Sequence, residues 1–140
     1  MKHTFKKGFT LIELLVVIGV IAILAAIVLV AVNPGRQFAS ARDTQRKSDL
    51  YSITNAIYQY ATEHNGNLPP SFPTTPTCIG TAAPCYDLAS YVVATYIAEM
   101  PHDPTTGSDA NTQYTIYEDA NGRIVAQATG ELTSTITVTR

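Results

Sequence analysis

An uninterrupted apolar run near the start of the chain restricts its fold more than any other feature. Residues 14–32 are nineteen consecutive uncharged residues, nearly all of them Leu, Ile, Val or Ala. As an α-helix, this run would extend about 28 Å, close to the ~30 Å hydrocarbon core of a bilayer. The remainder of the 140-residue chain is polar and offers no second span. We therefore expect one hydrophobic helix that carries one small soluble head.

The start of the chain differs from an ordinary secretory signal peptide. A secretory apolar segment is about 7–15 residues long and precedes a small-residue cleavage site, whereas this longer run leads to Asn33-Pro34-Gly35. A plain membrane anchor leaves Glu13 unexplained, because a carboxylate near the centre of a membrane helix costs about 2.5–3.5 kcal/mol. The cost is smaller near the membrane surface, so one interpretation is that Glu13 extends its carboxylate to the headgroups.

Residues 7–27, KGFTLIELLVVIGVIAILAAI, closely resemble the leader and first helix of type IV pilins and type II secretion pseudopilins. Basic residues, Gly, Phe, Thr-Leu-Ile-Glu and an apolar helix in this order carry the resemblance, which is close over about residues 6–32 and looser beyond. It implies that a prepilin peptidase cuts between Gly8 and Phe9 on the cytoplasmic face. The same enzyme would then methylate the new amino group of Phe9.

The cut implied by this resemblance divides the chain into three parts. Residues 1–8 would be a leader removed by prepilin peptidase. Residues 9–35 would be a hydrophobic transmembrane and filament-core helix, and residues 36–140 a globular head that includes the amphipathic half of the helix. Because the cut precedes the apolar run, the mature chain keeps its hydrophobic helix.

The resemblance also gives Glu13 a role in assembly. After the cut, Phe9 carries a cationic α-amine, and helices stacked with an axial offset would bring Glu13 of one subunit to Phe9 of another. A buried ion pair adds little net stability, but a misaligned subunit leaves an unpaired charge in hydrocarbon at a cost of several kcal/mol. We therefore expect Glu13 to specify the register of assembly.

The helix is expected to break at Pro34 and Gly35. Proline removes one backbone hydrogen bond and clashes with the preceding turn, which costs about 3 kcal/mol in a helix interior. The adjacent glycine weakens the helix further. We expect a kink or stretched region near residues 30–36, which either gives a filament axial compliance or is a local bend without function.

Beyond the break, residues 37–64 lack Gly and Pro and are expected to continue the helix until the turn residues that follow. An apolar stripe at helical spacing needs a cover and consists of Leu50, Ile53, Ala56, Ile57, Tyr60 and Ala61. Charged residues fall largely on other faces of this helix: Arg42, Arg46, Lys47 and Asp49. The basic residues between 36 and 47 would pair with anionic headgroups before assembly, or with acids of neighbouring heads afterwards.

The rest of the head is predicted to combine a short helix with a small sheet. Residues 68–77 contain four prolines and indicate a loop, and residues 87–99 favour a second helix with Asp87 as its N-cap. Strands are predicted from three segments, residues 113–118, 123–129 and 132–139, the first two joined by a hairpin turn. Three antiparallel strands against the long helix give an α+β fold of the pilin type.

Cys78 and Cys85 have two interpretations. The leader implies that the head lies outside the cytoplasm, where a disulfide between them is the default. Closing this ring would stabilise the head by about 2.5 kcal/mol in the chain-entropy description. A zinc pair is the alternative, although no further Cys and no nearby His complete four ligands.

The sequence does not favour an enzyme. It has no G-x-S-x-G, H-E-x-x-H or phosphate-loop motif, and its histidines are His3, His64 and His102. Asp103, Asp109 and Asp119 are candidate calcium ligands, since the resemblance to secretion pseudopilins implies a calcium site in a C-terminal loop. Their spacing matches neither that loop nor an EF-hand, so a solvated loop is preferred. We expect no cofactor, no metal and no catalytic residue.

Charge argues against nucleic-acid binding by the single subunit. Removal of residues 1–8 leaves six basic residues against eleven acidic ones, a net charge of about −5. From residue 51 onward only Arg123 and Arg140 oppose eight acids, so such a head repels phosphate backbones.

Taken with the resemblance, these features predict a structural subunit. We expect it to span the cytoplasmic membrane once before assembly, and then to polymerise into a type IV pilus-like filament of identical subunits on the cell surface. Its partners would be prepilin peptidase and the pilus assembly machinery. Two alternatives stay open: a pseudopilin of a type II secretion or competence system, and a monomeric single-pass membrane protein with a ligand-binding head.

Overall fold

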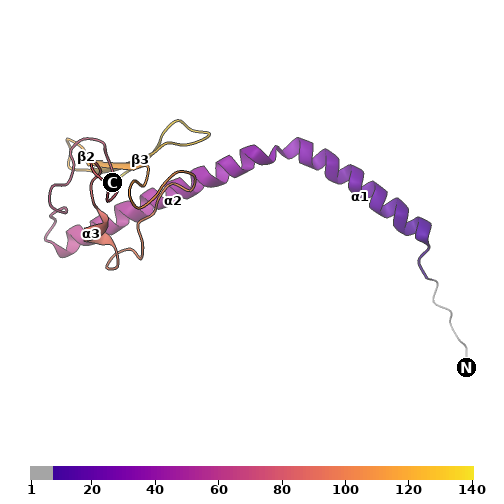
Figure 1. Cartoon of the computed structure of the whole chain (residues 1–140), viewed down its shortest axis with the longest axis horizontal. Helices are drawn as coiled ribbons and strands as arrows, with labels where there is room; N and C mark the ends of the chain where they lie inside the picture. Colours follow the sequence, from indigo (N-terminus) through magenta and orange to yellow (C-terminus); the bar gives the residue numbers. More distant parts are fainter. Residues whose placement is uncertain (1–7) are drawn as a thin grey trace, which may run out of the picture. The chain divides into compact units, whose positions relative to one another are not determined.

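The computed structural model describes residues 8–140, so residues 1–7 of the expected leader lie outside the described part of the chain. The chain divides into two compact units (Figure 1). The first ends at Gln37, and the second comprises Phe38–Arg140.

The first unit contains the apolar helix α1, Leu11–Val32. Within residues 8–140, α1 is the one helix that is long and apolar enough to cross a membrane. The length agrees with the sequence, in which uncharged residues continue to Val32.

α1 ends at Asn33, whose backbone is left-handed with φ 45°. Asn tolerates this conformation better than most residues because its short polar side chain hydrogen-bonds locally, here accepting from the Arg36 N–H at 3.4 Å. α2, Pro34–Glu63, then begins with proline at its first position, where no backbone N–H is needed. The interruption thus lies at the Asn33–Pro34 step, whereas Gly35 is inside α2.

The second unit is built on α2 from Phe38 onward and on a four-stranded antiparallel sheet in the order β1-β2-β3-β4. The strands are β1 (Thr77–Cys78), β2 (Tyr114–Glu118), β3 (Ile124–Ala128) and β4 (Ile136–Thr139). The predicted α+β fold is therefore confirmed, with one more strand than expected. Figure 1 shows β2 and β3 beside the second half of α2.

One apolar core joins the helix to the sheet. The stripe residues Leu50, Ile53 and Ile57 are buried on α2 and share a core with Tyr114 and Ile116 of β2. Partners from the other strands are Ile124 and Ala126 of β3 and Val138 of β4. The helical spacing seen in the sequence therefore identified the face of α2 that needs a cover.

The predicted hairpin joins β2 to β3 through residues 119–123. The Asp119 carboxylate accepts hydrogen bonds from the N–H groups of Asn121 and Arg123, each at 2.9 Å. Gly122 has φ 75°, which suits glycine in a tight turn. The register pairs Glu118 with Ile124 and Tyr114 with Ala128.

The second helix is much shorter than predicted. α3 spans only Ala89–Val92, instead of residues 87–99. Asp87 is not its N-cap residue, although its carboxylate accepts from the Ser90 N–H at 3.3 Å. The chain turns away at Ala94, whose φ is 68°, and Ala94 donates its N–H to the Ile97 carbonyl at 2.8 Å.

Candidate functional site

The first functional feature is the apolar surface of α1. No residue of α1 is buried, and every large apolar side chain from Phe9 to Val32 is exposed. Isolated exposed apolar residues are common on soluble proteins, but a continuous apolar helix surface is not. This surface needs lipid or other protein chains around it, because burial of apolar area contributes about 25 cal/mol per Å².

Glu13 stabilises the start of α1 through three reciprocal hydrogen bonds with Thr10. The Thr10 N–H and hydroxyl both donate to Glu13 Oε2 at 2.8 Å, and the Glu13 N–H donates to the Thr10 hydroxyl at 3.2 Å. This is a capping box, which satisfies N–H groups that have no partner inside the helix. Within residues 8–140, Glu13 Oε1 accepts no hydrogen bond, so one oxygen stays available.

Gly8 and Phe9 lie immediately before this helix. Both residues are exposed, Phe9 at 90%, and neither belongs to a helix or strand. A bond between them is therefore in accessible, non-helical backbone, as a protease requires. The rest of the expected leader, residues 1–7, lies outside the described part of the chain.

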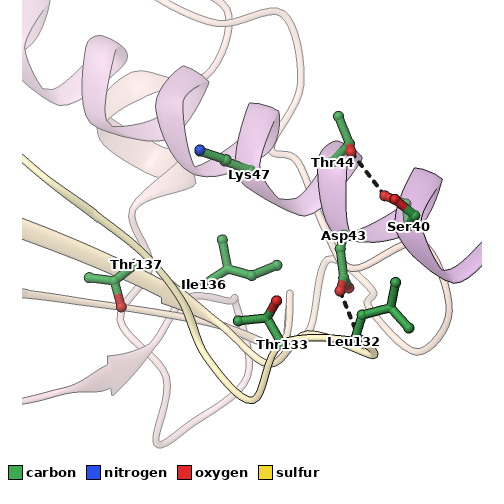
Figure 2. Close-up of a pocket in the computed structure, with 8 residues that line it drawn as sticks. All are labelled: Ser40, Asp43, Thr44, Lys47, Leu132, Thr133, Ile136 and Thr137. Carbon is green, nitrogen blue, oxygen red and sulfur yellow. Dashed lines mark hydrogen bonds between the residues drawn. The ribbon is translucent and has the colours of Figure 1, made fainter.

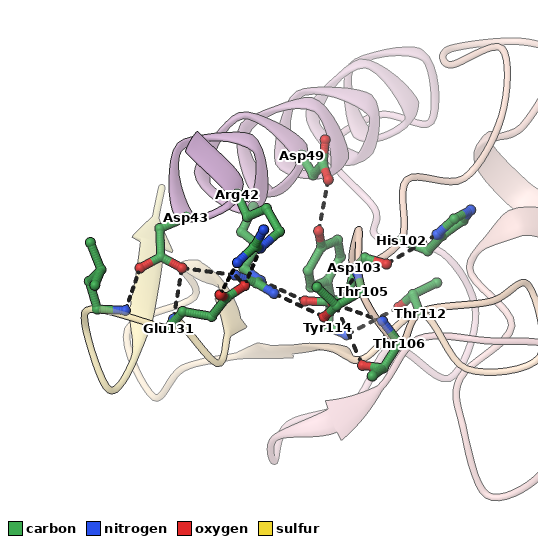
Figure 3. Close-up of polar contacts among 12 residues, drawn as sticks. Arg42, Asp43, Asp49, His102, Asp103, Thr105, Thr106, Thr112, Tyr114 and Glu131 are labelled. Atoms are coloured by element: carbon green, nitrogen blue, oxygen red, sulfur yellow. Dashed lines mark hydrogen bonds and ion pairs between the residues drawn. The ribbon is translucent and has the colours of Figure 1, made fainter. Parts of the chain in front are cut away.

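A cluster of ion pairs around Arg46 is the main polar feature of the second unit, and Figure 3 labels its partners Asp43, Asp103 and Glu131. Arg46 is only 2% exposed. Its guanidinium donates to Asp103 Oδ2 at 2.6 Å, to Asp43 Oδ1 at 2.9 Å and to Glu131 Oε1 at 2.9 Å. Arg42 pairs with the same Glu131, with Nε donating to Oε1 at 2.6 Å.

This cluster corrects the expectation for the basic segment of α2. Arg42 and Arg46 were expected on a polar face, ready to pair with headgroups or neighbouring heads. Both instead pair with acids of their own head, and Arg46 is buried. The cause is the loop that precedes β4, which brings Glu131 over this part of α2.

The ion pairs shift the acidity of their carboxylates. Hydrogen bonds from Arg42 and Arg46 lower the pKa of Glu131 to about 2. Burial would raise the pKa of Asp103, but hydrogen bonds from Arg46, Thr105 and Thr106 lower it well below its usual range. Asp103, considered above as a calcium ligand, is thus the partner of a buried arginine.

Asp49 is a second buried acid that the helical wheel placed on the polar side. Its Oδ1 accepts from the Gln45 side chain at 2.7 Å, and its Oδ2 accepts from the Tyr114 hydroxyl at 2.7 Å. Tyr114 is fully buried on β2. Burial, and then the bond to Asp49, raise the pKa of this tyrosine. The contact therefore ties α2 to the centre of the sheet.

Asp43 holds the loop between β3 and β4 against α2. Its carboxylate accepts from the N–H groups of Glu131 at 2.8 Å and Leu132 at 2.9 Å. Gly130 permits the tight turn of this loop against Asp43, because a Cβ there would lie 2.2 Å from the Thr133 carbonyl oxygen and 3.2 Å from Asp43 Oδ2. An open cleft of about 530 Å³ lies beside this loop (Figure 2). Its walls are formed by Ser40, Asp43, Thr44, Lys47, Leu132, Thr133, Ile136 and Thr137.

Cys78 and Cys85 are joined by a disulfide that closes the loop after β1. Residues 8–140 therefore contain no free cysteine. In the same part of the chain, no three His, Cys, Asp or Glu side chains converge as a metal site would require. His64 stacks on Tyr60 with ring centroids 3.8 Å apart, and Asp119 is engaged in the β2–β3 turn.

Comparisons with known proteins agree with the motif at the start of the chain. Residues 4–29 match the family model described as the prokaryotic N-terminal methylation motif. The chain is 32% identical over 111 residues to the type II secretion system core protein G of Aeromonas hydrophila, covering 74% of this chain and 71% of that protein. No solved structure matches.

Proposed function

This chain belongs to the family of prepilins and type II secretion pseudopilins, and we propose that its mature form polymerises into a helical filament through α1. As a member of that family it is a structural subunit, and its membrane helix anchors it before assembly. The observation that carries the proposal is the unbroken exposed apolar surface of α1. In a filament, neighbouring α1 helices replace lipid around this surface.

Processing is the first step of the proposal. We propose that prepilin peptidase removes residues 1–8 by cutting between Gly8 and Phe9, and then methylates the Phe9 amine. The exposed, non-helical backbone at this bond supports the cut. The capping box supports its position, because Thr10 and Glu13 remain together in the mature chain and still cap α1.

Glu13 is proposed to set the register of neighbouring subunits. Its Oε2 serves the Thr10 cap, while Oε1 is open to a donor from another chain. The methylated amine of Phe9 from an adjacent subunit is a cationic donor that fits this role. A subunit in the wrong register would leave both charges unpaired in an apolar bundle, which costs several kcal/mol.

Two kinds of filament remain candidates. The sequence predicts a type IV pilus on the cell surface as the first candidate. The similarity to a core protein of type II secretion favours the second candidate, a short pseudopilus within the cell envelope. In both, the head faces outward from the filament core, and the assembly machinery of the corresponding system is the proposed partner.

The decisive test is to express the full chain with its prepilin peptidase and recover material sheared from cells. We expect the mature chain to lack residues 1–8 and to carry one added methyl group by mass spectrometry. Electron microscopy of the same fraction should show filaments. A catalytically inactive peptidase is the control, and should leave the unprocessed chain in the membrane.

The result also separates the two candidates. Long filaments at native expression support the pilus, whereas filaments seen only on overexpression support the pseudopilus. A processed chain that never leaves the membrane fraction as a polymer would contradict both, and would leave the monomeric single-pass protein.

A further inference from the structure

Two cationic side chains of the second unit, Lys47 and Arg140, stand outside its ion pairs and lie near the exposed Tyr51. Lys47 precedes Tyr51 by four residues on α2, so the two side chains share a helix face. The Arg140 guanidinium, just after β4, lies 5.9 Å from the centroid of the Tyr51 ring. Neither Lys47 nor Arg140 forms an ion pair within residues 8–140. These three residues are called the Tyr51 patch.

Tyr51 is 40% exposed, although it lies on a helix whose opposite face is fully buried. Tyrosine and arginine are both enriched at protein interfaces, because an aromatic ring supplies a large contact area at low cost in conformational entropy and arginine pairs well with both rings and acids. The Tyr51 patch therefore has the composition of a contact surface.

An apolar pocket with two acids at its mouth lies elsewhere on the same unit. Its volume is about 290 Å³. The apolar lining comes from Ile79, Ala89, Val93 and Met100, and Glu99 and Asp109 are its exposed acids. Neither acid forms an ion pair in the part of the chain that the structure describes. This cavity is called the Met100 pocket.

The Met100 pocket is preformed by backbone contacts. The Thr81 N–H donates to the Asp109 carbonyl at 3.0 Å, and the Ala82 N–H donates to the Ala110 carbonyl at 3.1 Å. Gly80 allows this approach, because a Cβ there would lie 2.2 Å from the Ala110 oxygen. The Cys78–Cys85 disulfide closes the same loop. A rigid pocket loses little entropy when it is filled.

We propose that the Met100 pocket of one subunit receives Tyr51 from a second copy of this chain. Lys47 and Arg140 of the incoming copy then face Glu99 and Asp109, so two unpaired cations meet two unpaired acids. At about 290 Å³ the pocket is slightly smaller than a typical small-molecule site of about 300–1,000 Å³, so a single side chain is a more suitable occupant than a larger ligand. Met100 adds a sulfur contact that favours an aromatic ring.

The positions of the two surfaces explain why this contact makes a polymer. Arg140 follows β4, and Ile79 follows β1, and these strands form opposite edges of the sheet. One subunit can therefore offer its Tyr51 patch to one neighbour and its Met100 pocket to another. Such a head-to-tail contact generates an open helix instead of a closed dimer. The inference rests on the proposed filament function and specifies how the heads pack.

Cysteine cross-linking tests the contact in intact filaments. In the variant with Tyr51→Cys and Ala98→Cys, mild oxidation is expected to give a ladder of dimers, trimers and longer species. Ala98 is a good probe because it lines the pocket and is exposed. The control variant combines Ala98→Cys with Tyr58→Cys. Tyr58 is 37% exposed, similar to Tyr51, and lies two turns further along α2. The control should give no ladder.

Charge reversal gives an independent measurement. Lys47→Glu should reduce the filament yield at least about tenfold, because like charges across an interface cost several kcal/mol. Adding Glu99→Lys to this variant should restore the yield to within about twofold of the original chain. Adding Glu118→Lys instead, on β2 and away from the pocket lining, should restore nothing.

The outcomes separate this inference from the function on which it rests. Filaments that form normally but give no Tyr51–Ala98 ladder overturn the proposed contact and leave the filament function in place. A ladder that stops at dimers also overturns it, because a head-to-tail contact must continue. If the unsubstituted chain forms no filament, the proposed function fails and the contact fails with it.

Discussion

Glu13 serves two partners in the proposed filament, the Thr10 cap of its own helix and the Phe9 amine of a neighbour. The two roles differ chemically, because the cap needs only an acceptor oxygen whereas the amine needs a negative charge. Glutamine keeps the acceptor oxygen that the cap needs but lacks the negative charge that the amine needs. Glutamine also occurs naturally at this position of a capping box. We predict that Glu13→Gln reduces filament yield as strongly as Glu13→Ala does.

Helix content separates the two roles of Glu13. Circular dichroism of the full chain in detergent should show the original helicity for Glu13→Gln and a slightly frayed α1 for Glu13→Ala. Normal filaments from Glu13→Gln would mean that the cap, and not the charge, is what assembly requires.

Arg46 should be far more important for the stability of the head than other charged residues. Its removal leaves Asp103 buried without its cationic partner, and breaking such a pair typically costs about 3–5 kcal/mol. We predict a loss of this size for Arg46→Met in urea unfolding of the full chain in detergent, followed by near-ultraviolet circular dichroism. Arg123→Met is the control and should unfold almost as the original chain does, because Arg123 forms an exposed pair.

The same carboxylates should make the head sensitive to acid. In the unfolded chain Glu131 and Asp103 titrate near pH 4, whereas in the fold the pKa of Glu131 is about 2 and that of Asp103 is lower still. A lowered folded-state pKa stabilises the fold above about pH 4, and this contribution is lost as the pH falls toward 2 and below. We predict that the urea midpoint declines between about pH 5 and pH 2.

The acid dependence should be shallower in Arg46→Met, because without the guanidinium both carboxylates titrate closer to their unfolded values. A midpoint independent of pH in the original chain would contradict the ion pairs as described.

Sequence patterns predicted the apolar side chains of α2 better than its charged ones. Leu50, Ile53 and Ile57 are identified by spacing alone, because a helix packed on one side needs a continuous stripe. Arg46 is not, because its partners Asp103 and Glu131 are 57 and 85 residues away along the chain. The Thr10–Glu13 cap, in contrast, has a local signature, Thr-x-x-Glu, that was present in the sequence.

The step between α1 and α2 depends on two residues that stop a helix by different means. Asn33 adopts a left-handed backbone, and Pro34 supplies no N–H to continue the hydrogen bonding of α1. We propose that this step gives a filament axial compliance. Ala at both positions favours a right-handed helix, so Asn33→Ala with Pro34→Ala should merge α1 and α2 into one helix.

Spin labels at Val28→Cys and Thr44→Cys can measure this change, because the native cysteines are joined and do not react. Electron–electron distances in the double variant should form one narrow distribution near that of a continuous helix, about 24 Å for sixteen residues. The same distribution in the original chain would contradict a break in the helix at Asn33.

Short secondary structure was the least predictable part of the head. β1 has only two residues, and its pairing with β2 depends on contacts from a distant segment. α3 was predicted too long because residues 87–99 have an apolar spacing compatible with a helix. Many of those residues are β-branched or aromatic and form helices weakly, and α3 ends at Val92, just before a local turn in which the Ala94 N–H donates to the Ile97 carbonyl.

We propose that assembly replaces the lipid around α1 with neighbouring α1 helices, and this exchange can be followed directly. The sequence contains no tryptophan, so a single Trp placed on α1 reports its surroundings without background. We predict that Val20→Trp or Leu24→Trp is quenched by brominated lipid while the chain is in the membrane. In filaments, neither brominated lipid nor acrylamide should quench the fluorescence of the same Trp, because neighbouring helices enclose it.

Thr62→Trp, on the exposed surface of α2, provides the matched control and should be quenched by acrylamide in both states. The comparison distinguishes a filament core of packed helices from a filament held together by its heads alone. In the second case α1 would need lipid or detergent around it even after assembly, since about 25 cal/mol per Å² of apolar surface opposes its exposure to water. A Trp on α1 that stays accessible to brominated lipid in purified filaments would therefore contradict the central role proposed for this helix, whatever contacts the heads make.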